Sequence, residues 1–294
     1  MLTRRLIVAA LCCWFAAGVN AAEITLITPG ETALTREFTE SLRARRPDDR
    51  VQVVPVPTAA EPLAPTDLIV TLGQAGLSWR LQADIDTPTV AAYVTTSSLP
   101  TDTPLPNGLQ ILLASPKPER QLALARALLP RLSNISLLYS PEAALRLEAW
   151  EHAAETLGLH IATAELGDAA QLATRVAKVL EASDVLIGTD DPAVYNADTL
   201  KTILLTSYAR NKVLIGPSAP FIAAGSLSTT FSTPAQMAES VDRLLDARRT
   251  TTPSVHYPDS FSVLSNQQVA RSLGLPIPDD ERLARELTKQ EQIP

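Results

Sequence analysis

The segment that decides the fold is residues 184–216, DVLIGTDDPAVYNADTLKTILLTSYARNKVLIG, in which an amphipathic stretch separates two apolar runs. The runs at 184–188 and 213–216 have the length and continuous apolar character of strands that are buried on both faces. Residues 192–210 between them predict a helix, because proline at 192 suits the first helical position. Strand, helix and strand in this order predict a right-handed βαβ unit of a parallel sheet.

The same alternation continues on both sides of this unit. In the first part of the chain we expect strands at 23–28, 51–56, 67–72, 89–94 and 109–113, with helices at 31–46, 73–84 and 117–129. Around the unit we expect strands at 135–139 and 159–164, with helices at 141–157 and 168–181. After it we expect strands at 226–231 and 261–264, with helices at 234–248 and 266–273. Two such series predict an α/β protein with two Rossmann-like lobes, each built on a parallel sheet.

The elements that follow the second series are too few for a third domain. They suit a chain that returns to complete both lobes. We therefore expect 22–132 and 225–260 to form lobe 1, and 133–224 and 261–294 to form lobe 2.

The first 21 residues, MLTRRLIVAALCCWFAAGVNA, have the features of a secretory signal peptide. Arg4 and Arg5 precede the apolar run 6–17, and small residues before Ala22 predict cleavage near Ala21. A retained anchor is the alternative, but the apolar run is shorter than the roughly twenty residues that a spanning helix needs. Both cysteines lie in this segment, so the exported chain would have no disulfide and would depend on its apolar core.

Composition and charge exclude several functions. The chain has 294 residues, 25 Lys and Arg against 32 Asp and Glu, and a net charge of −7 without a basic block, so we expect no nucleic-acid partner. None of the three histidines has a second one at helical metal-binding spacing, so we expect no metal. The chain contains no nucleophile elbow, P-loop or dinucleotide fingerprint, so we expect no cofactor and no enzymatic activity. An exported hydrolase, the enzyme alternative, would need a nucleophile beside a base, which the placement of the histidines does not favour.

Small molecules bind open α/β sheets beyond the carboxyl ends of the strands. The segments expected there supply backbone N–H groups, hydroxyls and carboxylates, which can hold a polar ligand. The candidate ligand-binding residues are Thr28, Gly73, Gln74, Thr95, Thr96, Ser140, Asp190, Asp191, Tyr195, Ser218 and Phe221.

Each candidate also has a structural interpretation. Gly73 can serve a tight turn, Ser140 and Asp191 can cap the helices that the following prolines begin, and Tyr195 can pack in the core. The functional interpretation of the Asp190-Asp191 pair is a carboxylate at the mouth of a cleft that accepts from a ligand ammonium or hydroxyl.

Three stretches of the chain resemble the substrate-binding proteins of ABC transporters, in particular those whose best-known members carry tryptophan or tyrosine. The stretches are DLIVTLGQAG (67–76), DVLIGTDDPAVYNADTLKTILLTSYARNKVLIGPSAPFIAAGSLSTTF (184–231) and NQQVARSLGLPIP (266–278). The resemblance implies the type I periplasmic binding protein fold, in which three crossover segments join the two lobes and the ligand is trapped between them. It also implies that the loops of Asp190, Asp191 and Tyr195 and of Ser218 contact the ligand.

These observations predict an exported, periplasmic or otherwise extracytoplasmic solute-binding protein. We expect it to capture an amino acid or a similar small polar or carboxylate compound and to deliver it to an ABC permease in the membrane. Nothing indicates an obligate dimer, so we expect a monomer. The chain has Thr95, Thr96, Ser97 and Ser98 where the family usually has a T-D-P-type turn. This departure leaves open the alternative of an exported ligand-sensing module without transport coupling.

Overall fold

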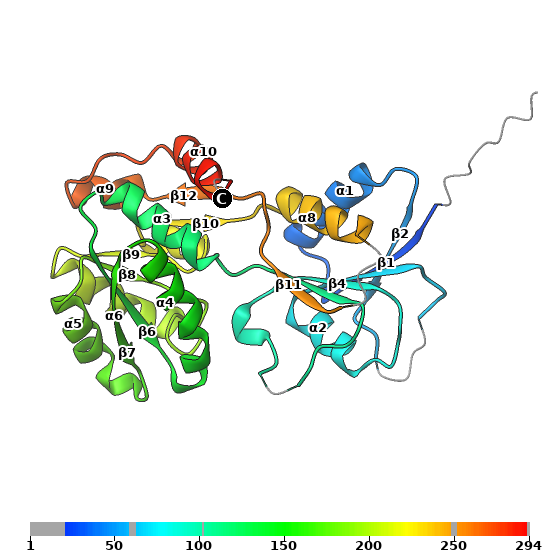
Figure 1. The fold of residues 1–294 in the computed structure, drawn as a ribbon, viewed down its shortest axis with the longest axis horizontal. Helices are drawn as coiled ribbons and strands as arrows, with labels where there is room; N and C mark the ends of the chain where they lie inside the picture. The colour runs from blue at the N-terminus through cyan, green and yellow to red at the C-terminus, as the bar shows by residue number, and fades with distance from the viewer. Residues whose placement is uncertain (1–20, 59–62, 102, 248–251, 293–294) are drawn as a thin grey trace, which may run out of the picture.

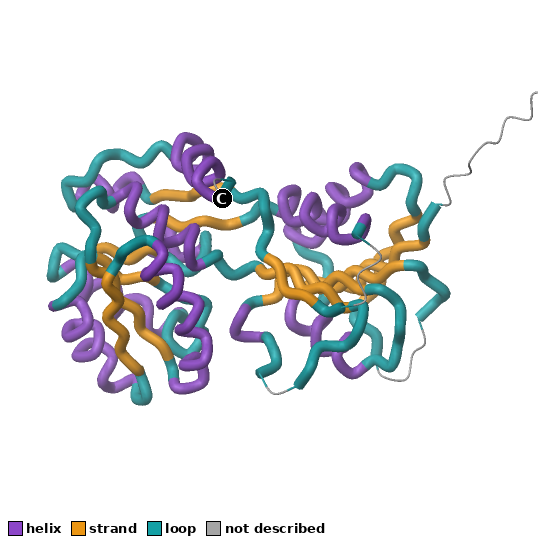
Figure 2. Tube along the Cα trace, in the orientation of Figure 1, coloured by secondary structure: helices purple, strands orange, loops and turns teal. Residues whose placement is uncertain are grey.

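The computed structural model describes residues 21–58, 63–101, 103–247 and 252–292. The chain forms two α/β lobes that lie side by side (Figure 1), each with one six-stranded sheet. Helices lie on both faces of the strands (Figure 2). The fold class predicted from the sequence is confirmed. The expected signal peptide lies outside the described residues, apart from Ala21.

The sheet of the first lobe is entirely parallel and has the strand order β11-β5-β4-β3-β1-β2. Its strands are β1 (Glu23–Thr28), β2 (Arg50–Pro55), β3 (Leu68–Leu72), β4 (Thr89–Val94), β5 (Leu109–Leu113) and β11 (Ser254–His256). The inner strands β3 and β5 are buried along their whole length, because helices cover both faces of the sheet.

Three helices cover the first sheet: α1 (Ala33–Arg45), α2 (Gly73–Gln82) and α8 (Pro234–Asp246). Thr32 caps α1 by accepting the backbone N–H of Thr35, and Phe38 and Leu42 turn into the core. Although α8 follows α1 by about two hundred residues in sequence, the two helices pack against each other on one face of the sheet (Figure 1). The first lobe is therefore completed by a late part of the chain.

The sheet of the second lobe has the order β12-β10-β9-β8-β6-β7, and only β12 runs antiparallel to its neighbour. Its strands are β6 (Asn134–Tyr139), β7 (His160–Glu165), β8 (Val185–Ile187), β9 (Val213–Ile215), β10 (Ser228–Phe231) and β12 (Ser262–Ser265). Its helices are α3 (Pro118–Leu128), α4 (Leu147–Thr156), α5 (Leu172–Glu181), α6 (Ala197–Tyr208), α7 (Pro220–Ala224), α9 (Gln267–Ser272) and α10 (Asp280–Glu291). Short 3-10 turns complete the structure: η1 (Thr96–Ser98), η2 (Pro141–Arg146) and η3 (Ala169–Gln171).

The structure differs from the sequence-based expectation at several elements. The helix expected from Pro192 begins at Ala197, because Asn196 is its N-cap and accepts the N–H groups of Asp198 and Thr199. Strand β11, which ends at His256, is not among the strands expected from the sequence.

Two elements expected in the first lobe belong to the second. Strand β10 pairs with β9, and α3 packs its leucines into the second lobe's core, so the expected boundaries at 132 and 225 do not coincide with the change of sheet.

Each lobe has its own apolar core. In the first lobe, Leu26, Phe38 and Val70 belong to one cluster, and Leu77 and Ile111 belong to another. The second lobe has two further clusters, formed around α3, α4 and α10 and around α5 and α6. No cluster of described buried residues draws members from both lobes. The covalent chain and hydrogen bonds such as that from Thr96 to Asp190 join the lobes.

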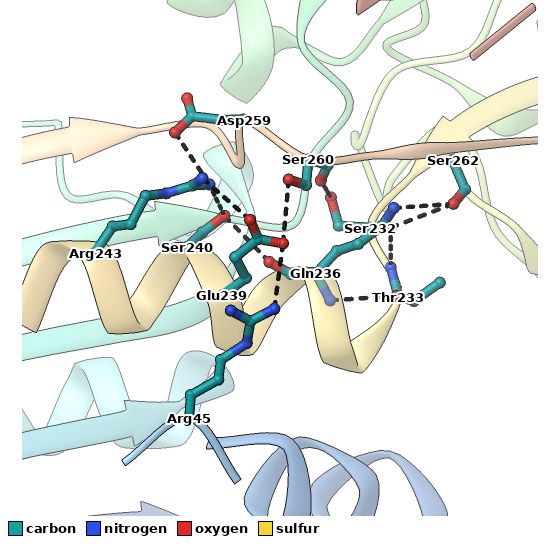
Figure 3. A network of polar contacts seen from close by, with 10 residues as sticks. All are labelled: Arg45, Ser232, Thr233, Gln236, Glu239, Ser240, Arg243, Asp259, Ser260 and Ser262. Atoms are coloured by element: carbon teal, nitrogen blue, oxygen red, sulfur yellow. Dashed lines mark hydrogen bonds and ion pairs between the residues drawn. The ribbon is translucent and has the colours of Figure 1, made fainter. Parts of the chain in front are cut away.

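The chain passes between the lobes three times, at 114–117, 232–233 and 257–261. Side chains tie the last two crossings together (Figure 3). The Ser232 hydroxyl donates to the Ser260 carbonyl oxygen at 2.9 Å, and the amide of Gln236 at the start of α8 donates to the Ser262 hydroxyl at 3.2 Å. The second and third crossings are therefore held side by side by hydrogen bonds where the chain passes from one lobe to the other. In the described part of the chain, no helix is both long and apolar enough to span a membrane.

Candidate functional site

Four loops meet where the two lobes face each other. The loops after β4 and β5 come from the first lobe, and those after β6 and β8 come from the second. All four leave the carboxyl ends of parallel strands, the edge at which open α/β sheets bind small molecules. The polar groups that they bring together include Thr96, Ser115, Arg146 and Asp190.

Asp190 is the centre of this meeting point. Its carboxylate accepts the Thr96 hydroxyl at 2.7 Å, the Ser97 N–H at 3.2 Å and the Ser115 hydroxyl at 2.5 Å. Thr96 and Ser97 belong to the first lobe and Ser115 to the first crossing, directly after β5, whereas Asp190 follows β8 of the second lobe. Among the described residues, no cation forms a salt bridge with Asp190, so a half-buried negative charge is held by neutral donors alone.

Arg146 also reaches from the second lobe to the first, but it donates hydrogen bonds where Asp190 accepts them. From the end of η2 in the second lobe, its Nε donates to the Thr96 carbonyl oxygen at 2.9 Å and its Nη2 to that of Ser97 at 3.3 Å. Its remaining contact is with the Glu142 carbonyl oxygen at 3.2 Å. The guanidinium is half-buried and, like Asp190, is bound by neutral groups in this part of the structure.

A cavity of about 600 Å³ lies beside these contacts, lined by groups from both lobes. Asp190, Arg146 and Thr96 form part of its polar wall, while Trp150 and Leu99 contribute apolar surface. The volume is within the range of small-molecule sites, and an apolar wall with a few converging polar groups is typical of such sites.

Tyr257, in the third crossing, also lines the cavity. Burial and the nearby Asp190 carboxylate raise the pKa of Tyr257 to about 12. The phenol is therefore neutral at ordinary pH and keeps its proton for donation.

A backbone irregularity precedes the loop after β4. Tyr93 has φ +57°, and the pairing of β4 with β5 shifts register between Ala92 and Val94. A non-glycine residue in the left-handed region marks a bulge that redirects the strand. In the following turn the Thr95 hydroxyl contacts those of Ser97 and Ser98, each at 2.8 Å. We call residues 95–98 the cleft turn.

Three predicted site residues use their polar groups inside the second lobe. The buried Asp191 carboxylate accepts the Ser140 N–H at 2.6 Å and the Ala193 N–H at 3.0 Å. Tyr195 is buried and donates its hydroxyl to the Ile187 carbonyl oxygen at 3.1 Å, and burial raises its pKa. Asp191, Ser140 and Tyr195 thus join β6 and β8 to the segment that leads to α6.

The remaining predicted residues lie apart from Asp190. Thr28 lines a separate cavity of about 350 Å³ against α1. Gly73 has φ +72° and opens α2, and the neighbouring Gln74 is exposed. The Ser218 carbonyl oxygen accepts the Phe221 N–H at 3.1 Å, and the Phe221 ring packs on the second lobe's core. Of the predicted set, the structure brings Thr95, Thr96 and Asp190 together.

Sequence reasoning missed Ser115 and Arg146. Ser115 follows β5, so the strand-end rule that selected Thr96 could also have found it. Arg146 lies seven residues beyond the end of β6, and its role depends on how one lobe faces the other, which periodicity does not encode. In the described residues no group of three His, Cys, Asp or Glu side chains could hold a metal ion.

Known structures resemble the chain, although its sequence matches no protein-family model and no curated protein. A ligand-free, open substrate binding protein with adhesive properties from Clostridium difficile matches with a TM-score of 0.68 and 13% identity, covering 89% of this chain and 97% of that one. An ABC domain in complex with L-Trp from Streptococcus pneumonia matches at 0.56 and 17%, covering 88% and 96%. A conserved domain protein from Vibrio cholerae matches at 0.55 and 16%, covering 88% and 96%. The fold is that of a type I periplasmic binding protein.

Proposed function

We propose that the chain is an exported solute-binding protein that captures a small polar molecule between its lobes and delivers it to an ABC-type permease. The observation that carries the proposal is Asp190, a half-buried carboxylate at the interlobe cavity whose donors come from the opposite lobe and the first crossing. A solute that offers an ammonium or hydroxyl group would take the place of these donors. Structural likeness to substrate-binding proteins that share the fold supports the same role.

The mechanism is closure about the three crossings. A solute first binds one lobe, and the other lobe then closes to complete its hydrogen bonds. A solute favours closure only through contacts that it makes in the closed form, because a ligand shifts an equilibrium only through its differential affinity. Excluding water from the cavity strengthens the charged contacts with Asp190 and Arg146.

An amino acid or a similar small compound with both a cationic and an anionic group suits the cavity best. Asp190 would accept from the cation and Arg146 would donate to the anion, since guanidinium and carboxylate groups form strong, directional pairs. The apolar wall formed by Trp150 and Leu99 would hold a side chain.

We further propose that the protein binds its solute without altering it. Ser115, the hydroxyl nearest the centre of the site, donates to a carboxylate, and no described histidine has a hydrogen bond with Ser115 or Asp190. An extracytoplasmic location agrees with the expected signal peptide, and release to a permease agrees with closure as a signal that a membrane protein can recognise.

The test is a thermal-shift screen of the purified protein against amino acids, short peptides, carboxylates and neutral sugars. A solute that binds the folded state raises the melting temperature by mass action. Asp190→Asn should weaken binding of the active compound by roughly tenfold to a hundredfold, because hydrogen bonds to a charged group contribute about 1.5–3 kcal/mol.

Asp48→Asn is the matched control. It removes the same charge from an exposed position just before β2, which is an edge strand of the first sheet. If no compound in the screen binds, or if Asp190→Asn binds the active compound as tightly as Asp48→Asn does, the proposal fails.

A further inference from the structure

The cleft turn presents both donors and acceptors to a pair of opposite charges. Toward Asp190 it donates the Thr96 hydroxyl and the Ser97 N–H. Toward Arg146 it offers the carbonyl oxygens of the same two residues. One short segment of the first lobe therefore satisfies both charged side chains that the second lobe directs into the cleft.

Other arginines of the protein show what is unusual about Arg146. Arg46 contacts three aspartates, and Arg120 forms two 2.8 Å hydrogen bonds with Glu291. Arg80 is buried with neutral acceptors only, but these lie within its own lobe and stay in place when the lobes move. Arg146 instead donates to the carbonyl oxygens of Thr96 and Ser97 on the first lobe. Any separation of the lobes therefore breaks these hydrogen bonds and exposes the Arg146 charge.

We propose that the ligand-free protein closes on itself, with the cleft turn occupying Asp190 and Arg146 as a built-in competitor that a solute must displace. The solute's part in this inference rests on the function proposed above. The self-closure itself depends only on contacts within the chain.

Displacement is physically reasonable because the turn is a weak occupant of a charged site. Its groups are neutral, whereas a solute with a cationic and an anionic group would add a coulombic attraction to Asp190 and Arg146 that the turn lacks. The turn is nevertheless always present at high effective concentration. The apparent affinity for a solute equals the intrinsic affinity multiplied by the fraction of molecules whose site is free, so weakening the turn should tighten solute binding.

Ser115 is the position that tests this competition. Its hydroxyl donates to Asp190 at 2.5 Å and accepts the Thr96 N–H at 2.9 Å, so it holds both the carboxylate and the cleft turn. Ser115→Ala removes both contacts with the loss of a single oxygen atom. Ser78→Ala is the matched control, because Ser78 is exposed on α2 of the first lobe and makes no described contact across the cleft.

The first measurement uses the ligand-free protein. In Ser115→Ala we expect a larger radius of gyration by small-angle scattering and exchange of the Ser97 amide proton about tenfold faster, as for a lost charged contact. Ser78→Ala should match the wild type in both measurements. Unchanged scattering and unchanged Ser97 exchange in Ser115→Ala would overturn the self-closure.

The second measurement adds an equimolar mixture of the twenty common L-amino acids, with a mixture of neutral monosaccharides as a parallel probe. The concentration that gives half of the maximal melting shift should be lower for Ser115→Ala than for the wild type. An unchanged or higher value would overturn the competition. If Ser115→Ala opens but neither mixture shifts any variant, self-closure is supported while the proposed solute-binding function is contradicted.

Discussion

At the end of β8, Asp190 and Asp191 direct their carboxylates to different lobes. Asp190 accepts three donors across the cleft, whereas Asp191 is buried and accepts the backbone N–H groups of Ser140 and Ala193. Adjacent residues diverge, so the pair is no acid–base couple. The Asp190 carboxylate faces the cleft between the lobes, and the Asp191 carboxylate joins the segments that follow β6 and β8.

This division predicts different costs for the two side chains. Asp191→Ala should lower the free energy of unfolding by about 1–3 kcal/mol, because it leaves the buried Ser140 N–H without its acceptor. Asp190→Ala should cost less, since its contacts lie between the lobes. Urea denaturation of both variants measures the difference, and equal costs would contradict this assignment.

Asp184, at the start of β8, predicts a pH dependence. Partial burial raises its pKa, but the N–H groups of Asn134 and Ser133 and the charge of Lys212 outweigh that effect and lower the pKa overall. The ionised form therefore stabilises the fold above the unfolded-state pKa of about 4, and this contribution is lost as the pH falls through the folded-state value.

The measurement is the difference in melting temperature between the wild type and Asp184→Asn. We expect a constant gap from neutral pH down to about pH 5, narrowing below about pH 4. A gap that widens on acidification would show that the sign is wrong.

At the scale of elements, the ends of β8 and β9 approach closely beside the site. A Cβ on Gly188 would lie 2.6 Å from Pro217 Cδ and 3.0 Å from Pro217 N, so a side chain does not fit without movement. The glycine thus lets the loop that carries Asp190 lie against the loop after β9.

Gly188→Ala should cost about 1–3 kcal/mol of unfolding free energy, the usual cost of overpacking. It should also weaken the binding of any solute that depends on Asp190, since the loop must shift. Gly167→Ala is the control, because a Cβ there meets nothing within 4 Å. Denaturation and solute titration measure the two effects, and wild-type values for both in Gly188→Ala would refute the close approach.

The elements that the sequence did not predict have weak patterns for physical reasons. Strand β11 is three residues long and has no buried side chain, so it offers no apolar run. Helix α10 is rich in charge and buries only Leu283 and Leu287 along a narrow stripe. The long helices and buried strands were predictable because their side chains pack on a core. Helix α6 begins at Ala197 because Asn196 caps it. The sequence analysis placed the start at Pro192, since proline favours the first helical position.

For the whole molecule, separate cores predict separate unfolding units. Phe38 is fully buried in the first lobe, and its ring meets the Tyr93 ring edge-on with the two ring centroids 5.8 Å apart. Phe38→Ala should destabilise that lobe by about 3–5 kcal/mol. Hydrogen exchange should become faster in β1 and β3 and remain unchanged in β6 and β8.

Ile203→Ala, in the core of the second lobe, should give the reverse pattern. If either substitution accelerates exchange equally in both sheets, the molecule unfolds as one unit and the two-core description is wrong.

The candidate site was predictable only in part. The strand-end rule selected Asp190 and Thr96, because it needs no knowledge of how the lobes face each other. It also selected Thr28 and Ser218, which lie apart, since many strands end at the same edge and only some ends meet across the gap. Arg146 could not be identified, because its partners lie on the other lobe.

The three crossings bear on how the protein is made. The sheet of the first lobe lacks its edge strand β11 until residues beyond 230 have been synthesised. Until then, helix α1 also lacks its partner α8. The second lobe also needs the last strand and the last helix of the chain, β12 and α10. No single cut in the chain would release either half intact, so neither half can complete its sheet before the last part of the chain has been made.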